Sequence, residues 1–150
     1  MVLMSIDEID LKILKNLLID ARQSARKLSL KLGLSTVTVL SRIKKLEKLK
    51  IIKGYTAILD DEKLGFDLTT IIEISVKKGQ MALVEKEVST LDNVCAVYDI
   101  TGQTDAIVIA KFKNREDLSE FVKQLSAKPN VEYTNTHMVL NTVKEDFRII

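Results

Sequence analysis

The sequence predicts an α+β protein in which a small helical domain precedes a larger domain of βαββαβ order. Apolar residues recur at helical intervals through the first part of the chain, with polar capping residues between the segments. Further on, β-branched stretches alternate with helical patterns, and this alternation occurs twice. We expect one domain over residues 1–60 and another over 69–150. The segment 61–68 should be a linker, because it is polar and contains Gly65.

Three helices fit the N-terminal domain. The first opens with Ser5 and Glu8 at capping-box spacing. The second can start at Ser24 and stop at Gly33, and Ser35 can cap the third. The inner face of the third helix is then formed by Val39, Ile43 and Leu46. Only "GLS" separates the second and third helices, and two short helices joined so tightly must cross steeply, as in a helix-turn-helix.

The segment "IIKGYTAILD" (51–60) follows the third helix and predicts a short hairpin, or wing, because it is β-branched and aromatic and is broken by Gly54. The charge is also unevenly distributed along the chain. Although the net charge is only +2, Arg22 to Lys53 hold 10 basic residues and a single acid, Glu47. Such a block indicates a polyanionic partner, and the alternative is a solvated basic surface.

An internal duplication organises the second domain. "TTIIEISVK" and "TDAIVIAKFK" each precede a helical pattern, which is followed in both cases by a strand opening with Asn-Val. The two pairs, Asn93-Val94 and Asn130-Val131, lie 37 residues apart, and Pro129 stands where the second helix must end. Two strand-helix-strand units give the ferredoxin-like βαββαβ arrangement. Because two helices leave one sheet face open, we expect a second copy of the chain to cover it.

The outward face of the third helix is fixed by its period once the inner face is buried. The residues on this face and its flanks are Thr36, Val37, Leu40, Ser41, Arg42, Lys44 and Lys45. In a helix-turn-helix, short hydroxyl and methyl groups at the start of the second helix can meet base edges in the major groove of double-stranded DNA. Cations further along can meet phosphates. The alternative is that Val37 and Leu40 pack against another helix.

The segment "ITGQTDA" lies between two apolar strands and carries a candidate ligand site. Gly102 allows a positive φ, so the chain can turn sharply and expose backbone N–H groups that could hold a carboxylate. Asp105 could take an ammonium group, while Thr101, Gln103 and Thr104 offer neutral hydrogen bonds. These groups suit the zwitterionic end of a free amino acid. A plain hairpin turn is the alternative.

Other functional constellations are absent from the sequence. With one histidine, His137, and one cysteine, Cys95, no metal site can be assembled from soft ligands. No Ser/His/Asp grouping, phosphate-binding loop or dinucleotide fingerprint is present, so we predict no enzymatic activity and no cofactor. No apolar run reaches the roughly 20 residues of a membrane span, and the first residues do not form a secretory signal. The single cysteine fits a reducing cytoplasm.

Several motifs, taken in order, resemble the Lrp/AsnC (leucine-responsive, feast/famine) family of transcription regulators. They are D-x-x-D before I-L (Asp7 to Leu14), the G-L-S turn, R-I-x-x-L-E (Arg42 to Glu47) and I-x-G-Y (Ile52 to Tyr55). The similarity continues in "VYDITGQTDAIV" and "EYTNTHMVL". It implies a winged helix-turn-helix that binds DNA as a dimer. The implied recognition residues are Thr36, Val37, Thr38, Leu40, Ser41 and Lys44, with Arg42 near the DNA backbone.

The resemblance also implies that the second domain mediates dimerisation, further assembly to an octamer and the sensing of an amino acid. The implied effector site comprises Thr101, Gly102, Gln103, Thr104 and Asp105, with Thr134 and Thr136 of a T-x-T motif lining the same cleft. Two departures from the family pattern bear on function. Gln103 replaces an acid, which favours a small or polar effector. Lys50 replaces a glycine, and a left-handed residue there would cost lysine about 1 kcal/mol.

The sequence therefore predicts a DNA-binding transcription regulator that responds to a small amino acid. Because Val37 and Leu40 stand where the family usually has polar residues, we expect recognition through thymine methyl groups and DNA shape. Two alternatives remain open at this stage: a DNA-organising protein with a vestigial effector site, and a ferredoxin-like oligomer that binds a small molecule. The effector, the target genes and the direction of regulation are also open.

Overall fold

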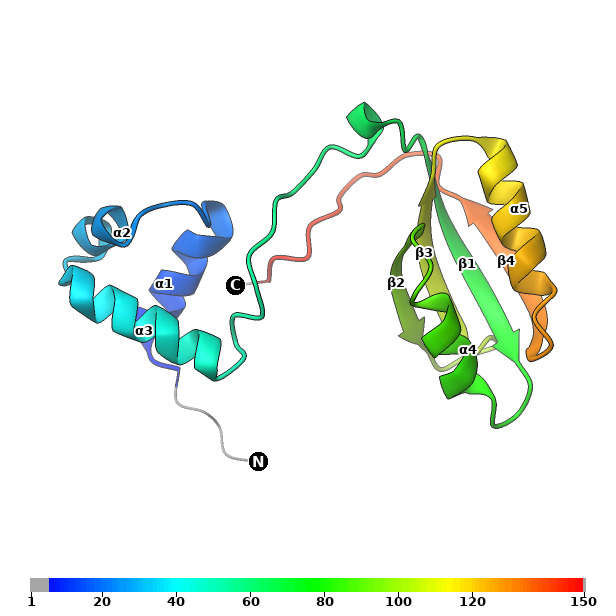
Figure 1. The fold of residues 1–150 in the computed structure, drawn as a ribbon, viewed down its shortest axis with the longest axis horizontal. Coiled ribbons are helices and arrows are strands. Elements are labelled where there is room, and N and C mark those ends of the chain that lie inside the picture. The colour runs from blue at the N-terminus through cyan, green and yellow to red at the C-terminus, as the bar shows by residue number, and fades with distance from the viewer. Residues whose placement is uncertain (1–5, 150) are drawn as a thin grey trace. The chain divides into compact units, whose positions relative to one another are not determined.

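The computed structural model describes residues 6–149, which form two compact units (Figure 1). The helical unit comprises the chain up to Ile58 together with the segment from Glu145 onward. The sheet unit spans Leu59–Lys144. The segment from Glu145 was expected in the second domain. In this structure it is clustered with the helical unit, where Arg148 Nη1 donates to the carbonyl of Leu18 at 3.2 Å.

Three helices build the helical unit: α1 (Glu8–Ile19), α2 (Ala25–Leu32) and α3 (Thr36–Lys48). They form one apolar core because each turns a stripe of large side chains inward. The fully or almost fully buried members of this core are Ile13, Leu14, Leu28, Val39 and Leu46. The tight connection between α2 and α3 confirms the predicted helix-turn-helix.

Helix boundaries follow the capping residues. Ser24 accepts a hydrogen bond from Lys27 N at 3.1 Å, and Ser35 accepts one from Thr38 N at 3.0 Å, as predicted. Gly33 ends α2 with a φ of 67°, a conformation that glycine adopts without steric cost. At α1 the capping box is formed by Asp7 and Asp10 rather than by the predicted Ser5 and Glu8. Ser5 lies outside the described residues.

The predicted wing is not present in the described chain, because residues 51–60 contain no strand. The first two residues of the segment are used to end α3. Ile51 N and Ile52 N both donate to the carbonyl of Leu46, at 3.0 and 3.2 Å, and Lys50 N donates to Glu47 O at 2.9 Å. This bonding pattern is a Schellman motif, whose central residue must be left-handed. Lys50 has a φ of 59°, so the turn keeps the glycine-type conformation despite the lysine.

The sheet unit has the predicted order β1, α4, β2, β3, α5, β4. Its elements are β1 (Leu68–Val76), α4 (Met81–Val88), β2 (Val94–Asp99), β3 (Ala106–Phe112), α5 (Arg115–Ser126) and β4 (Val131–Met138). The four strands form one antiparallel sheet in the order β2-β3-β1-β4, which is the ferredoxin-like topology. Before β1, a short 3-10 turn (Glu62–Leu64) lies within the expected linker, and Lys111 Nζ approaches Asp61 Oδ2 at 2.7 Å.

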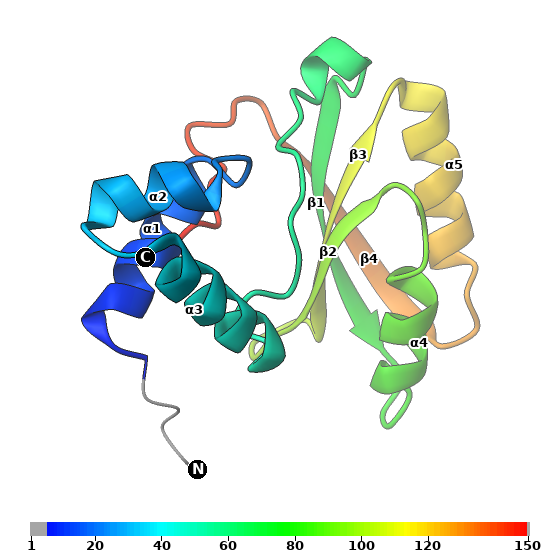
Figure 2. The same cartoon turned by 60° about the vertical axis from the view of Figure 1, so that its left-hand side comes forward.

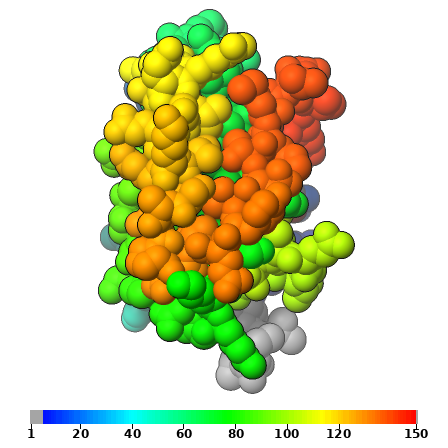
Figure 3. Space-filling view, turned by 90° about the vertical axis from the view of Figure 1, so that its right-hand side faces the viewer, coloured from blue at the N-terminus to red at the C-terminus, as the bar shows by residue number. Residues whose placement is uncertain are grey.

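Both helices pack on the same side of the sheet (Figure 2). The covered face carries the large core of this unit, including Ile72, Val108 and Phe112, all of which are completely buried. Within the sheet unit, α5 lies beside the edge strand β4 (Figure 3). Within residues 6–149, no helix of this unit covers the opposite face of the sheet, and Ile71, Tyr98 and Tyr133 remain substantially exposed there.

Candidate DNA-binding helix and effector turn

The first candidate site is an exposed strip on α3, formed by Val37, Leu40, Ser41 and Lys44. Val37 keeps 76% of its surface accessible and Leu40 keeps 45%, although both belong to a helix that buries Val39 and Leu46 completely. Ser41 and Lys44 are exposed on the same side. Because these positions recur at helical spacing, they form one continuous strip of methyl, hydroxyl and ammonium groups. Such a strip offers the groups that read base edges at one end and a phosphate-binding cation further along.

The two threonines at the start of α3 are less available than the sequence suggested. Thr36 Oγ1 lies 3.2 Å from Ser29 Oγ of α2, and Thr38 Oγ1 lies 2.8 Å from Ser35 Oγ. Both threonines are half-buried. Their hydroxyls therefore help to fix the turn between the two helices, while Val37 between them projects outward.

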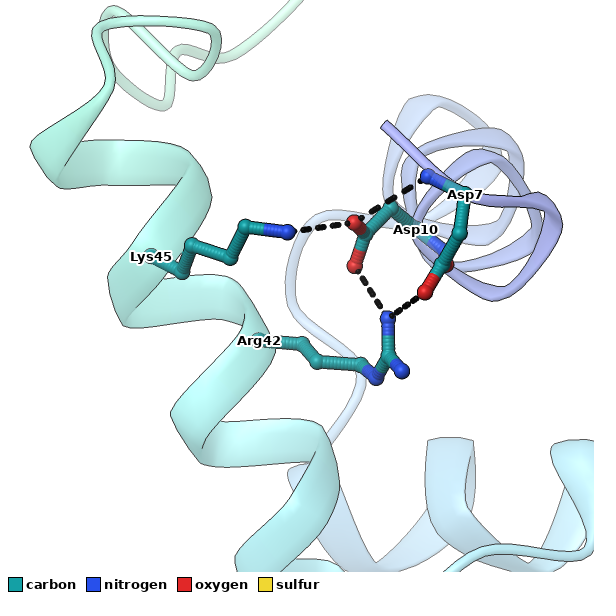
Figure 4. A network of polar contacts seen from close by, with 4 residues as sticks. All are labelled: Asp7, Asp10, Arg42 and Lys45. Carbon is teal, nitrogen blue, oxygen red and sulfur yellow. Dashed lines mark hydrogen bonds and ion pairs between the residues drawn. The ribbon is translucent and has the colours of Figure 1, made fainter. Parts of the chain in front are cut away.

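Arg42 and Lys45 do not lie on the strip but point toward the start of α1 (Figure 4). Arg42 Nη1 donates to Asp7 Oδ2 at 2.6 Å and to Asp10 Oδ1 at 2.8 Å. Lys45 Nζ donates to Asp10 Oδ2 at 3.0 Å. The guanidinium of Arg42 is thus held by two carboxylates of its own chain, and the expectation that it lies near the DNA backbone stays a prediction.

The carboxylates of this network are held in their charged form. Burial raises the pKa of Asp10, but the hydrogen bonds from Arg42 and Lys45 outweigh it, and the net pKa lies below the ordinary 3.8. The hydrogen bond from Arg42 is the main cause that lowers the pKa of Asp7. The sequence carried a signal for this arrangement. Asp10 interrupts the apolar stripe of α1, and an acid in such a position requires a buried cationic partner.

The second candidate site is the turn between β2 and β3. Gly102 has a φ of 151°, so the predicted positive φ is confirmed. Thr101 and Gln103 are exposed and Thr104 is half-buried. Asp105 Oδ2 accepts a hydrogen bond from Val76 N at 2.8 Å, and Asp105 N donates to Ile74 O at 2.9 Å. The turn is thereby fastened to the end of β1, and one oxygen of the proposed ammonium-binding carboxylate already has a partner.

Thr134 and Thr136 lie on β4, on the other side of β1. Thr134 pairs with Ile74 and Thr136 pairs with Ile72, so both share the helix-covered face with those buried residues. Thr134 Oγ1 also lies 2.9 Å from Ser126 Oγ at the end of α5, a partner that sequence reasoning missed. Since Ile74 pairs with Ala106 as well, Thr134 and the start of β3 lie in one row, about two strand spacings or 10 Å apart.

Metal sites and membrane spans are absent from the described residues. Among residues 6–149, no cluster of three or more His, Cys, Asp or Glu side chains could hold a metal ion. None of the helices in the same range combines the length and the apolar character that crossing a bilayer would need.

Two family models match this chain. The model of the AsnC-type helix-turn-helix domain matches residues 6–47, and the model of the Lrp/AsnC ligand-binding domain matches residues 69–149. A similar solved structure is that of a transcriptional regulator from Neisseria meningitidis in complex with L-Met. It has a TM-score of 0.90 and 28% identity, and 97% of each chain is covered. The structure of B. subtilis LrpC has a TM-score of 0.85 and 31% identity, covering 95% of this chain and 100% of the other.

Related sequences agree with the family models. An uncharacterised HTH-type transcriptional regulator of Pyrococcus furiosus is 46% identical over 146 residues, which cover 97% of this chain and 99% of that protein. The HTH-type transcriptional regulator FL11 of Pyrococcus horikoshii is 38% identical over 140 residues, with 93% of each chain covered. The chain therefore belongs to the Lrp/AsnC family of transcriptional regulators, which are not enzymes.

Proposed function

We propose that this protein regulates transcription by inserting α3 into the major groove of specific DNA sites, and that a small amino acid bound near the turn 101–105 modulates its affinity. The observation that carries the DNA-binding part is the strip on α3. Val37 is 76% exposed on a short helix whose opposite side is buried, and Ser41 and Lys44 continue the same line. Apolar and hydroxyl groups at such positions suit thymine methyl groups and base edges.

Direct contact with phosphate is assigned to Lys44 rather than to Arg42. Lys44 is exposed on the strip, whereas Arg42 is engaged with Asp7 and Asp10. Replacing Lys44 with alanine should reduce the slope of log affinity against log salt by about 0.9, the value for one lost phosphate contact. Lys12→Ala is the matched control, because Lys12 is an exposed lysine on α1. A slope that falls equally in both variants would contradict the assignment of Lys44.

The probes for this experiment are duplexes selected by the protein from a randomised library, followed by fluorescence anisotropy. A transcription regulator should enrich a sequence, and a symmetric one if the protein binds as a dimer. Enrichment of no sequence, together with salt-dependent binding, would instead support a DNA-organising protein. The absence of duplex binding at low salt would leave a small-molecule-binding oligomer as the remaining alternative.

The effector is proposed to place its ammonium group near Asp105 and its carboxylate at the backbone of the turn around Gly102. A structural neighbour, the Neisseria meningitidis regulator, was solved as a complex with L-Met, which supports an amino acid as the ligand class. In this chain, Gln103 is a neutral and exposed neighbour of the turn. We therefore expect a small or polar amino acid rather than a cationic one.

Asp105→Asn tests the effector site without opening the sheet. The amide oxygen of asparagine can still accept the hydrogen bond that Val76 N now donates to Asp105, but the negative charge is lost. Calorimetry with the free amino acids should show loss of binding in this variant, while DNA affinity without effector stays within about threefold. Asp92→Asn is the control, because Asp92 is an exposed acid just before the start of β2 and so at the opposite end of that strand from the turn. Retained effector binding in Asp105→Asn would overturn the assignment.

We further propose that the protein acts as a dimer formed through the open face of the sheet. Ile71, Tyr98 and Tyr133 are exposed there, and a second sheet would bury them. An effector bound between two copies could then shift the spacing of their α3 helices, with a coupling of about 1–3 kcal/mol. Light scattering at micromolar concentration should give at least a dimer. Tyr133→Glu should shift the protein toward monomer, whereas an unchanged mass would argue against this face.

A further inference from the structure

The structure assigns Asp10 a role as a positioning residue: together with Asp7 it holds α3 through Arg42 and Lys45, and so fixes which side of α3 meets DNA. This inference rests on the proposed DNA binding by α3 and names residues that set its specificity without touching DNA.

The carboxylates of Asp7 and Asp10 are held in fixed positions at the start of α1. Asp10 is completely buried, and in the capping box at the start of α1 each of the two carboxylates accepts from the backbone N–H of the other residue. Asp10 N donates to Asp7 Oδ1 at 2.8 Å, and Asp7 N approaches Asp10 Oδ2 at 3.4 Å. The two carboxylates are therefore oriented by the backbone of α1 rather than by flexible side chains, and they present a fixed pair of acceptors.

Arg42 and Lys45 of α3 both bind the carboxylate of Asp10. Arg42 and Lys45 stand three residues apart, so they project from one side of the helix nearly a turn apart. Their nitrogens bond to different oxygens of the same carboxylate of Asp10 (Figure 4). A single contact would allow α3 to roll about its axis, whereas two contacts at different heights on a fixed carboxylate oppose that movement. Arg42 adds a third point at Asp7.

The positions of Arg42 and Lys45 on the circumference of α3 make these contacts relevant to recognition. By the helical period, Arg42 and Lys45 lie between the buried stripe of Val39 and Leu46 and the exposed strip that begins at Val37. Rolling of α3 would move the strip relative to the bases. Recognition requires side chains held within about 10–20° of their productive orientation, a tolerance that apolar packing alone does not guarantee.

The same ion pairs limit non-specific attraction of α3 to DNA. Asp7 and Asp10 neutralise two of the cations in the basic stretch between Arg22 and Lys53. If Asp10 lost its charge, Arg42 would keep only Asp7, and the four-residue network would carry one more positive charge beside the DNA-binding strip. Any phosphate contact made in this way steepens the salt dependence by about 0.9. Loss of Asp10 should therefore raise affinity for arbitrary duplex DNA while lowering discrimination between sequences.

The experiment compares wild type, Asp10→Asn and Glu8→Gln. Glu8 lies in the first turn of α1 outside the network, so Glu8→Gln makes the same change in net charge nearby. The readout is the ratio of affinities for the selected duplex and for a scrambled duplex, measured at several salt concentrations on protein whose helicity matches wild type. In Asp10→Asn the ratio should fall about fivefold or more, the low end for one lost base contact, and binding to the scrambled duplex should strengthen. Glu8→Gln should keep the ratio.

Arg42→Lys keeps the inference testable if Asp10→Asn does not fold. It preserves the net charge but removes the planar guanidinium that reaches Asp7 and Asp10 together, so the ratio should fall without a gain in non-specific affinity. An unchanged ratio in Arg42→Lys, or equal losses for both duplexes in proportion to the unfolded fraction, would overturn the positioning role. A wild-type protein that bound neither duplex would instead refute the proposed function.

Discussion

Replacing Lys50 with glycine should stabilise the helical unit, because Lys50 occupies the left-handed position of the Schellman motif that ends α3. Its φ is 59°, and the motif is completed by the bonds from Lys50 N to Glu47 O and from Ile51 N to Leu46 O. A left-handed residue other than glycine costs about 1–2 kcal/mol. Glycine costs about 0.5–1 kcal/mol more backbone entropy on folding. The net gain should be about 0.5–1 kcal/mol, or roughly 4 °C in the melting temperature.

The assay is thermal and urea denaturation followed by the helical circular dichroism signal. Lys53→Gly is the matched control, since it removes the same charge and adds the same entropy cost at an exposed position without a positive φ. The Lys53→Gly variant should lose about 0.5–1 kcal/mol of unfolding free energy. Gly33→Ala is the converse test. A Cβ there meets nothing within 4 Å, so its loss of about 1 kcal/mol would come from the φ of 67° alone.

The difference between Lys50→Gly and Lys53→Gly isolates the relief of strain from changes in charge and chain entropy. Equal stabilities for these two variants would refute the strain argument. They would imply that the chain after α3 relaxes into another conformation at no cost.

The remaining predictions concern pH and packing. The stability conferred by Asp7 and Asp10 should be complete above pH 3.8, the ordinary pKa, and should be lost as the pH falls through their lowered values; acid melts of wild type and Asp10→Asn would check this. Burial and a hydrogen bond to Glu47 raise the pKa of Tyr55 to about 12. The stability that the bond between Tyr55 and Glu47 contributes should therefore persist below pH 10 and be lost as the pH rises through about 12. An absorbance titration should show this late step in wild type but not in Tyr55→Phe. Phe112→Ala empties a completely buried position and should destabilise the sheet unit by about 3–5 kcal/mol in urea denaturation, with m-values reporting any loss of cooperativity.

The regular elements could be predicted because their signals are local. The caps at Ser24 and Ser35 and the stop at Gly33 each depend on a few neighbouring residues, and all three are found where expected. The duplication marked by Asn-Val pairs predicted β2 and β4, which begin at Val94 and Val131. The fold class followed from these signals together with the family resemblance.

The sequence did not reveal partners that the tertiary structure supplies. Arg42 was placed beside DNA because its helical position permits it, and its bond to the buried carboxylate of Asp10, 32 residues away, could not be inferred from that position. The wing was predicted from β-branched composition, yet the backbone of Ile51 and Ile52 is taken by the end of α3. Composition indicates which conformation a segment prefers, whereas its hydrogen-bond partners depend on the tertiary structure around it.

The pairing of β4 with β1 places the effector turn and the T-x-T strand on opposite sides of a central strand. This arrangement has a consequence for the order in which the protein becomes functional during synthesis. Glu73 of β1 and Asn135 of β4 are hydrogen-bonded across 62 residues, one of the most distant pairings in the chain. Among the three helices, the side-chain bonds from Arg42 and Lys45 to Asp10 span 32 and 35 residues, so these helices can pack together earlier in synthesis. The nascent chain should therefore form its proposed recognition helix before it forms the proposed effector turn and the proposed dimer face. During that interval the proposed amino acid should have no site to bind, whatever its concentration.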